Sequence, residues 1–505
     1  MEPDKPIPTS TARERWVRGI VAGLVLAAGW IFLADRVRAQ EALADVVTLD
    51  EAVEIALRQN TDLKRAEAEA RALDFVATQE RMDFLPNLQL SSSGTRTFGR
   101  SFSQEEGGII NETSNFFGAE VNASVDLFNG FEHFASLRRA ELEEEASELR
   151  LERTRQDVVF LVFDGFTTLQ QNRQLAELRA QELEAQQELL EQVEALVDVG
   201  RRPISDLYQQ QAAVAEARAA VAEAERLVAL TETQLIQVLQ LDPTATYTFA
   251  APTLADADDP DLPTYELDQL LEEAFTRRAD LDAIETEAAA ARVGVRVAQA
   301  GYWPVLSLAV GYGSDWSSTA LVPVPGTGTD PRTITVTPDD GPPATFAVPG
   351  SGTDPDFVRP TFFDQLDQRR GGSIRLSLVV PIFDRLQTRT QVAQAEVAAL
   401  NARYALQDQQ QQVALQVRQA VLDYRSARVQ LAATTERVEA AERARDAASR
   451  RYELGAATFV ELTQAITEAV AAQSAQVRAR YDVLLAQTLI DYYTGQPDPQ
   501  RTLIP

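Results

Sequence analysis

An internal repeat with a constant spacing constrains this chain more than any other feature. The segment "TLDEAVEIALRQNTDL" (48–63) is matched 218 residues further on by "ELDQLLEEAFTRRADL" (266–281). The same spacing pairs "FLPNLQL" (84–90) with "YWPVLSL" (302–308). Self-similarity over so long a stretch predicts that the chain consists of two copies of one structural unit.

The spacing between the copies changes once. Phe128 is matched by Phe383, and Gly200 by Gly455, both 255 residues further on. The increase of 37 residues predicts one insertion, which lies within 311–372. That segment is rich in Pro, Gly, Thr and Asp, so we expect a long surface loop there.

Each copy is predicted to contain long helices and two short strands. Apolar residues at three- and four-residue spacing, such as Val158, Leu161 and Val162, indicate a buried helical stripe. One continuous helix of about 100 Å, at ~1.5 Å per residue, is expected beside two shorter helices placed end to end. The expected helices are 48–84, 132–199 and 204–240 in the first copy, and 266–301, 386–454 and 459–494 in the second.

The strand segments alternate between apolar and polar residues. In "AEVNASVDLF" (119–128) and "SIRLSLVVP" (373–381), every second residue is apolar. This pattern fits a sheet on a soluble core, and it also fits the wall of a membrane β-barrel. Aromatic residues at the strand ends favour the barrel: Phe84, Phe128, Tyr302, Trp303 and Phe383. Four strands cannot close a barrel, and open edges are not tolerated in lipid, so a barrel requires several copies of the chain.

Composition excludes several classes of function. The 505 residues contain no cysteine, so disulfides, thiolate metal sites and thiol nucleophiles are absent. The only histidine is His133, which we expect at the surface. A single histidine argues against a histidine metal cluster and against most histidine-dependent catalytic triads. A net charge of −29 argues against nucleic acid as a partner. We therefore expect neither an enzyme nor a cofactor.

The N-terminus has the pattern of a secretory signal peptide. Basic residues precede an apolar run (20–34), and small residues follow it. Cleavage is expected after Ala39, with Ala44 as the second choice; an uncleaved membrane anchor is the alternative. The expected organisation is a signal peptide (1–39), a first repeat (40–241), a linker (242–265), a second repeat (266–496) with the loop 311–372, and a tail (497–505).

Taken together, these features resemble the TolC-like outer membrane efflux proteins. The resemblance rests on the tandem strand–helix repeat, the two helix-to-strand junctions, and the turns "VDVG…SDL" and "YELG…VEL". It implies a mostly α-helical chain with transmembrane β-strands. Three copies would form a twelve-stranded outer-membrane β-barrel and a periplasmic α-helical barrel. Such a homotrimer is the passive exit duct of a tripartite efflux or type I secretion system. Its partners would be outer-membrane lipid, a periplasmic adaptor protein and an inner-membrane pump of the RND, ABC or MFS class.

The resemblance also implies site residues at the periplasmic end of the tunnel. The adaptor-docking turns would contain Gly200, Leu207, Gly455, Ala456 and Leu462. Tip contacts would come from Asp206, Tyr452, Arg201 and Arg202, and the pore constriction from Glu461 and Gln464. The family's basic residue two positions after the second glycine is replaced by Ala457 in this chain. Arg201 and Arg202 of the other turn are the expected substitutes.

Two alternatives remain open from the sequence. Gly200 and Gly455 also fit helix C-caps with positive φ, and "TFVE" (458–461) fits a capping box in which Glu461 reaches back to the amide of Thr458. For the whole chain, the alternative is an exported periplasmic coiled-coil scaffold without a pore.

Overall fold

A computed structural model describes most of the chain. The described residues are 46–103, 108–111, 113–250, 263–324, 332–337, 341–348 and 356–496. The predicted signal peptide with both cleavage sites, the centre of the linker (251–262) and the tail 497–505 lie outside them.

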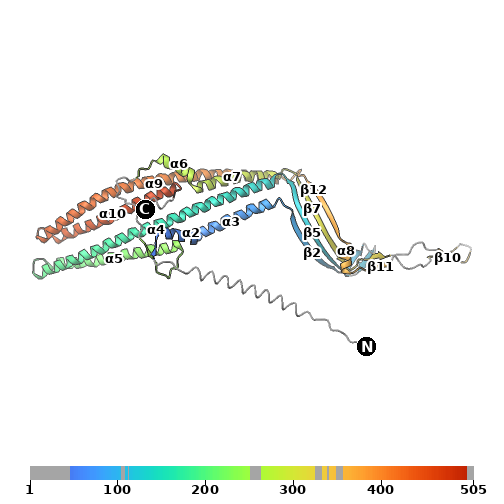
Figure 1. Ribbon diagram of the computed structural model, residues 1–505, viewed down its shortest axis with the longest axis horizontal. Coiled ribbons are helices and arrows are strands. Elements are labelled where there is room, and N and C mark those ends of the chain that lie inside the picture. The colour runs from blue at the N-terminus through green and yellow to red at the C-terminus, as the bar shows by residue number, and fades with distance from the viewer. Residues whose placement is uncertain are drawn as a thin grey trace, which may run out of the picture. The chain divides into compact units, whose positions relative to one another are not determined.

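The order of elements repeats along the chain (Figure 1). The first series is α2 (Leu49–Gln59), α3 (Thr61–Met82), β2 (Asn87–Thr97), β5 (Ser114–Asn129), α4 (Glu132–Asp198) and α5 (Ile204–Leu239). The second is α6 (Leu267–Arg277), α7 (Ala279–Ala300), β7 (Val305–Ser317), β12 (Gly371–Val379), α9 (Gln387–Glu453) and α10 (Phe459–Tyr493). The long helices agree with expectation, but the strands are longer than expected, since β5 has 16 residues and β7 has 13.

The first helix of each series is broken, which corrects the continuous helices expected over 48–84 and 266–301. Asn60 leaves the helical conformation with ψ 130°, and its Oδ1 accepts from the amides of Asp62 and Leu63 at 2.9 and 3.2 Å. A side chain that caps the next helix in this way favours a new helix start over continuation. Arg278 is the break residue of the second series, with ψ 113°.

The two break residues also have equivalent partners. The side-chain amide of Asn60 donates to the carbonyl of Val238 at 3.2 Å, and a guanidinium nitrogen of Arg278 lies 3.5 Å from the carbonyl of Tyr493. Val238 and Tyr493 are themselves separated by the repeat spacing of 255. Each break therefore fixes the first helix pair against the end of the last helix in its own series.

The repeat extends to the backbone conformation. Positive φ recurs in pairs 255 residues apart: Gly130 and Arg385 (70° and 57°), Phe131 and Leu386 (67° and 66°), Gly200 and Gly455 (74° and 75°), and Gln240 and Gly495 (55° and 80°). Non-glycine residues rarely adopt this conformation. The positive φ recurs at matched positions even where the two residues differ, so the two series share the same backbone path.

The four long strands form one antiparallel sheet in the order β12-β7-β5-β2. Its register opposes Val121 to Tyr312 and Val125 to Leu308, so apolar side chains share one face. On the other face, Ser307 donates to Asp126 at 2.7 Å. We call these the apolar face and the polar face of the sheet.

The insertion is only partly a loop, which corrects the prediction for 311–372. Strand β7 continues to Ser317 and β12 begins at Gly371. Between them, β8 (Val322–Val324) pairs with β11 (Asp356–Val358), and β9 (Arg332–Val336) pairs with β10 (Ala344–Val348). The helix α8 (Phe362–Gln368) is held on β7, because Ser314 donates to the carbonyl of Leu366 at 2.6 Å. Two further pairs are β3 (Arg100–Ser103) with β4 (Gly108–Asn111), and β1 (Val46–Val47) with β6 (Thr248–Phe249).

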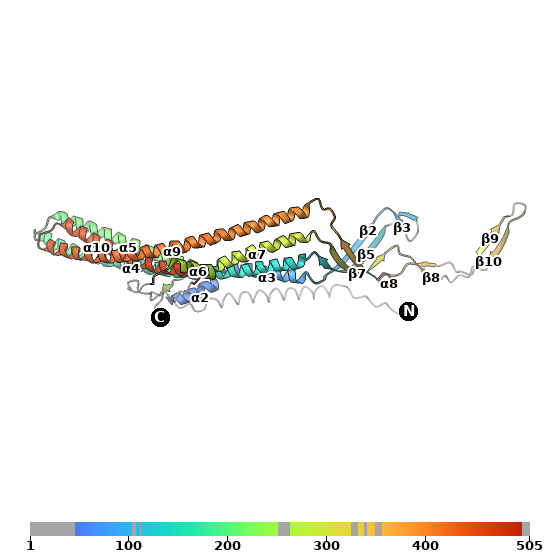
Figure 2. The same ribbon diagram turned by 90° about the horizontal axis from the view of Figure 1, so that it is seen from above.

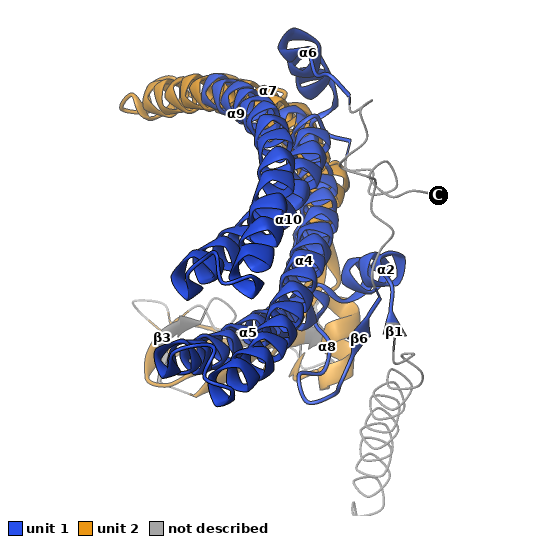
Figure 3. Ribbon diagram, turned by 90° about the vertical axis from the view of Figure 1, so that its left-hand side faces the viewer, with its two compact units in different colours: residues 1–69, 148–282, 407–505 blue, residues 70–147, 283–406 orange. Residues whose placement is uncertain are grey.

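The chain divides into two compact units (Figure 3). The first unit comprises 1–69, 148–282 and 407–505, and the second comprises 70–147 and 283–406. The second unit holds the four-stranded sheet and the helix ends that adjoin it. No helix in the part of the chain that the structure describes has the length and apolarity needed to cross a membrane.

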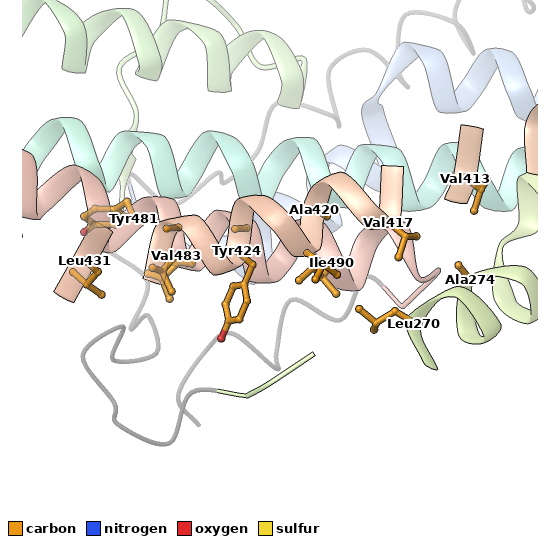
Figure 4. Close-up of a cluster of buried hydrophobic side chains, with 14 of the residues drawn as sticks. Leu270, Ala274, Val413, Val417, Ala420, Tyr424, Leu431, Tyr481, Val483 and Ile490 are labelled. Carbon is orange, nitrogen blue, oxygen red and sulfur yellow. The ribbon is translucent and has the colours of Figure 1, made fainter. Parts of the chain in front are cut away.

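The first unit has two main apolar cores. One lies where α4 and α5 meet α2 and β6, and its largest buried side chains include Phe163, Phe166 and Leu235. The other lies where α9 and α10 meet α6, around Tyr424, Leu484 and Ile490 (Figure 4). Each core thus joins one long helical hairpin to the short helix that begins its own series.

Candidate functional site at the two helical turns

The turns that join α4 to α5 and α9 to α10 have the same backbone geometry. Gly200 and Gly455 have φ 74° and 75°. The amide of Gly200 donates to the carbonyl of Val197 at 2.9 Å, and that of Arg201 to Leu196 at 2.9 Å. Gly455 and Ala456 donate to Tyr452 and Arg451 at 2.9 and 2.7 Å in the same pattern. This is the Schellman motif, so both glycines are helix C-caps, as the sequence predicts.

The helical partners lie side by side up to these turns, α4 with α5 and α9 with α10 (Figures 1 and 2). Three residues join one turn to the other. Tyr452 is 3% exposed, and its hydroxyl donates to Asp206 at 3.4 Å. The guanidinium of Arg202 lies over the Tyr452 ring at 3.8 Å and also donates to the Tyr452 carbonyl. We call Arg202, Tyr452 and Asp206 the tip network.

Burial raises the pKa of Tyr452, and Asp206 raises it further, while the Arg202 charge opposes both effects. The hydroxyl therefore keeps its proton at neutral pH and remains a hydrogen-bond donor. Of the two arginines expected to substitute for the basic residue missing at Ala457, the structure brings Arg202 into the network. Arg201 is exposed and takes part in the turn through its backbone amide.

An apolar cluster supports the network from inside. Tyr452 packs with Val193, Ala457, Phe459 and Leu462, and the rings of Tyr452 and Phe459 are 5.9 Å apart. Leu462 is 2% exposed, and Leu207 packs against the same cluster. These two leucines therefore hold the turns in place, whereas Ala456 is exposed.

Glu461 takes only one half of the expected capping arrangement. Its amide donates to the Thr458 hydroxyl at 3.2 Å, so Thr458 caps α10. Its carboxylate instead lies 3.6 Å from the guanidinium of Arg451, with about half of the side chain exposed (52%). Gln464, one helical turn further, is also exposed. The backbone of Glu461 thus serves the cap, and its carboxylate faces solvent.

Exposed apolar side chains around both turns are site residues that the sequence reasoning missed. They are Val199, Ile204 and Tyr208 at the first turn, and Leu454 and Val460 at the second, each more than half exposed. Large exposed apolar side chains gathered in one place mark interaction surfaces. Their exposure could have been predicted from their position in the sequence, because apolar residues at a helix end beside a glycine turn have few neighbours to pack against.

A groove lies just behind the turns, between α4, α9 and α10. Its volume is about 370 Å³, and its lining includes Leu189 and Gln192 from α4, Arg445 and Ser449 from α9, and Ile466 from α10. Over the described ranges, no group of three or more His, Asp or Glu side chains could hold a metal ion.

In this chain two linked helical hairpins continue through their long helices into a four-stranded sheet with an exposed apolar face. The family model described as outer membrane efflux protein matches residues 52–239 and 270–496. The chain belongs to this family. It is an outer-membrane exit duct of an efflux system, with a large periplasmic portion, and its family and fold are those of channels.

Individual relatives agree with this assignment. The chain is 24% identical over 477 residues to outer membrane efflux protein BepC of Brucella suis biovar 1 (strain 1330), which covers 94% of this chain and 90% of that protein. The crystal structure of the outer membrane protein VceC from Vibrio cholerae matches 89% of this chain and 96% of its own, with a TM-score of 0.71 and 18% identity. The Campylobacter jejuni CmeC outer membrane channel matches 89% of this chain and 86% of its own, with a TM-score of 0.72 and 17% identity. At these identities the structural likeness shows the fold.

Proposed function

We propose that this chain works as a homotrimer that docks, through its two helical turns, to a periplasmic adaptor protein served by an inner-membrane pump. The observation that carries the proposal is the tip network, which joins the two helical turns so that they form a single surface at the end of the hairpins. Exposed Ala456 and the exposed apolar side chains at the turns give that end a surface on which another protein can pack.

The sheet supports the trimer. Strands β2 and β12 are the outer strands of the four-stranded sheet, and their apolar side chains are exposed, including Leu88, Leu90, Ile374 and Leu376. Unpaired edges in lipid leave backbone groups without partners, so each edge needs a neighbouring copy. Three copies of four strands would make the twelve-stranded barrel that the family resemblance implies.

The proposed entrance to the duct lies where α10 begins. Glu461 and Gln464 are exposed and one helical turn apart, so they share a side of α10. In a trimer, three symmetry-related Glu461 carboxylates would form a ring that favours cations. This ring is the proposed constriction.

A cysteine placed at Ala456 tests the docking. The chain has no cysteine of its own, so a short linker with a maleimide at one end and a photoreactive group at the other would attach to this protein at one position in cells and, on illumination, couple to whatever protein lies beside it. We expect Ala456→Cys to capture an adaptor protein whose own purification brings down an inner-membrane pump. The control is Ala398→Cys, which is exposed on α9 but distant along that helix from the turn. Equal capture from both positions, or capture from neither, would contradict docking at the turns.

A further inference from the structure

A second site lies at the junction between the sheet and the helices, inside the second unit. A pocket of about 280 Å³ opens between the start of α4 and the end of α7. Phe131, Phe134 and Arg138 of the α4 side line it, together with Arg296 and Trp303 of the α7 side. We call it the junction pocket. The docking function proposed for the turns makes no use of it.

The aromatic wall of the junction pocket continues the apolar face of the sheet. Phe128 is paired in register with Leu306, which shares a face with Leu308, Val310 and Tyr312. The Phe131 ring meets the Phe128 ring edge-on at 5.3 Å, and Phe134 follows at 6.5 Å from Phe131. Exposed aromatic side chains at the end of a lipid-facing strand occupy the boundary between hydrocarbon and water. If the apolar face meets lipid, as the proposed trimeric barrel requires, the pocket lies at the periplasmic boundary of the membrane, so this step rests on the proposed function.

The charges in the pocket are both positive. Arg138 and Arg296 line it, and no carboxylate does. Glu141 lies 3.5 Å from Arg138 but also 3.8 Å from Arg81, so its charge is shared between them. Arg296 makes no ion pair with any residue that the structure describes. Two arginines beside an aromatic wall stand out in a chain whose net charge is −29.

The internal repeat provides a comparison within the same molecule. At the other strand-to-helix junction, 255 residues further on, Leu386, Arg389 and Ala393 replace Phe131, Phe134 and Arg138. The combination of two aromatic rings with an arginine one turn later thus occurs at one junction and not at its repeat.

A glycine makes the close approach at the pocket. A Cβ at Gly130 would lie 2.7 Å from both the Ala300 carbonyl oxygen and the Trp303 Cβ, and Gly130 has φ 70°. Its repeat counterpart is Arg385, which carries a side chain. The start of α4 and the end of α7 can come this close only because residue 130 has no side chain.

We propose that the junction pocket binds an anionic phospholipid of the periplasmic leaflet. Arg138 and Arg296 contact its phosphate, and its acyl chains lie along Phe131, Phe134 and Trp303. Guanidinium groups are the preferred partners of phosphate, and basic pockets between helices at a membrane surface bind anionic headgroups. A lipid held there would brace the joint between sheet and helices.

Native mass spectrometry of the full-length protein in detergent, titrated with phosphatidylglycerol, tests the proposal. We expect the double substitution Arg138→Gln and Arg296→Gln to weaken binding by roughly tenfold or more, since each lost contact is a charge-assisted hydrogen bond. The matched control is Arg385→Gln with Arg389→Gln, which removes the same charge at the other junction. The control should bind as the unchanged protein does. Equal binding by both double variants would overturn the proposal.

Two further arms identify the source of the phosphate and the role of the aromatic wall. Inorganic phosphate and phosphatidylcholine should fail to compete with phosphatidylglycerol; competition by inorganic phosphate alone would mean an anion site and not a lipid site. Phe134→Ser keeps both arginines but removes an aromatic ring from the pocket, so it should lower the affinity for phosphatidylglycerol. Inorganic phosphate should still fail to compete in this variant. An unchanged affinity for phosphatidylglycerol would show that the aromatic wall does not contact the acyl chains. The adaptor capture at Ala456 should be the same in every variant, so the two proposals fail independently.

Discussion

At the scale of single residues, a buried tyrosine joins the two turns of this chain. Tyr452 contacts Asp206 through its hydroxyl and Arg202 through its ring, while Ala457 occupies a buried position in the cluster beside it. A cation and a carboxylate from the first turn thus both contact the tyrosine of the second turn.

Arg202→Gln should loosen the two turns. The substitution removes a cation–π contact of about 0.5–2 kcal/mol and a charge-assisted hydrogen bond of about 1.5–3 kcal/mol. We expect a higher single-channel conductance in planar bilayers, because the ends of the hairpins can move apart. Arg201→Gln is the control, since it changes the same charge one residue away and outside the network. An equal conductance in the two variants would show that the network does not hold the tip closed.

At the scale of elements, the breaks at Asn60 and Arg278 show how one architecture is kept by different chemistry. Asn60 caps the helix that follows it, whereas Arg278 is fixed by Asp280, with contacts of 2.9 and 2.6 Å. The Asp280 carboxylate is partly buried, which raises its pKa, but the hydrogen bonds and charge of Arg278 outweigh burial and the pKa is lowered overall. Both residues nevertheless bond to the equivalent carbonyl at the end of the last helix.

Asn60→Ala should destabilise the first unit by roughly 2 kcal/mol, because it removes the cap and leaves the partly buried carbonyl of Val238 without this donor. The measurement is urea-induced unfolding of the detergent-solubilised protein. Arg58→Ala, an exposed change two residues earlier on α2, should stay within about 0.5 kcal/mol of the unchanged protein. If the two variants unfold at the same urea concentration, Asn60 does not stabilise the break.

The helix α8 is held on the sheet by contacts with residues far away along the chain. Phe362 packs against Phe117 and Trp316, with ring centres 5.6 and 5.5 Å apart, and both partners belong to the apolar face of the sheet. The oxygen of the Gln365 side chain accepts from the Ser317 amide at 3.0 Å. Neither contact is visible in a segment whose composition is that of a loop, because the partners lie some 50 and 250 residues away along the chain.

At the scale of the whole molecule, the proposed ring of Glu461 exists only once three copies assemble. Within one chain its carboxylate pairs with Arg451 at 3.6 Å and stays half exposed, so this pair contributes little to stability. In the proposed trimer, the Glu461 carboxylate would therefore act mainly through its charge at the entrance.

Glu461→Gln should lower the preference of the channel for cations, because three negative charges leave the entrance together. The reversal potential under a salt gradient in planar bilayers measures this preference. Glu54→Gln, an exposed change on α2, removes the same charge away from the turns and should leave the reversal potential unchanged. The same reversal potential in both variants would restrict residue 461 to its backbone role in the cap.

The sequence alone determined the repeat, the long helices, the glycine turns and the alternating strands, because each depends on local periodicity or on the backbone freedom of glycine. The family resemblance added Asp206, Tyr452, Arg201 and Arg202 as expected contacts at the turns. Only the tertiary structure decided that Arg202 and not Arg201 reaches Tyr452, that Leu462 is buried, and that Asn60 and Arg278 break their helices. It likewise placed α8 on the sheet and brought Arg138 and Arg296 to one pocket. These outcomes depend on contacts between segments far apart in the chain, and their partners are known only once the chain is folded.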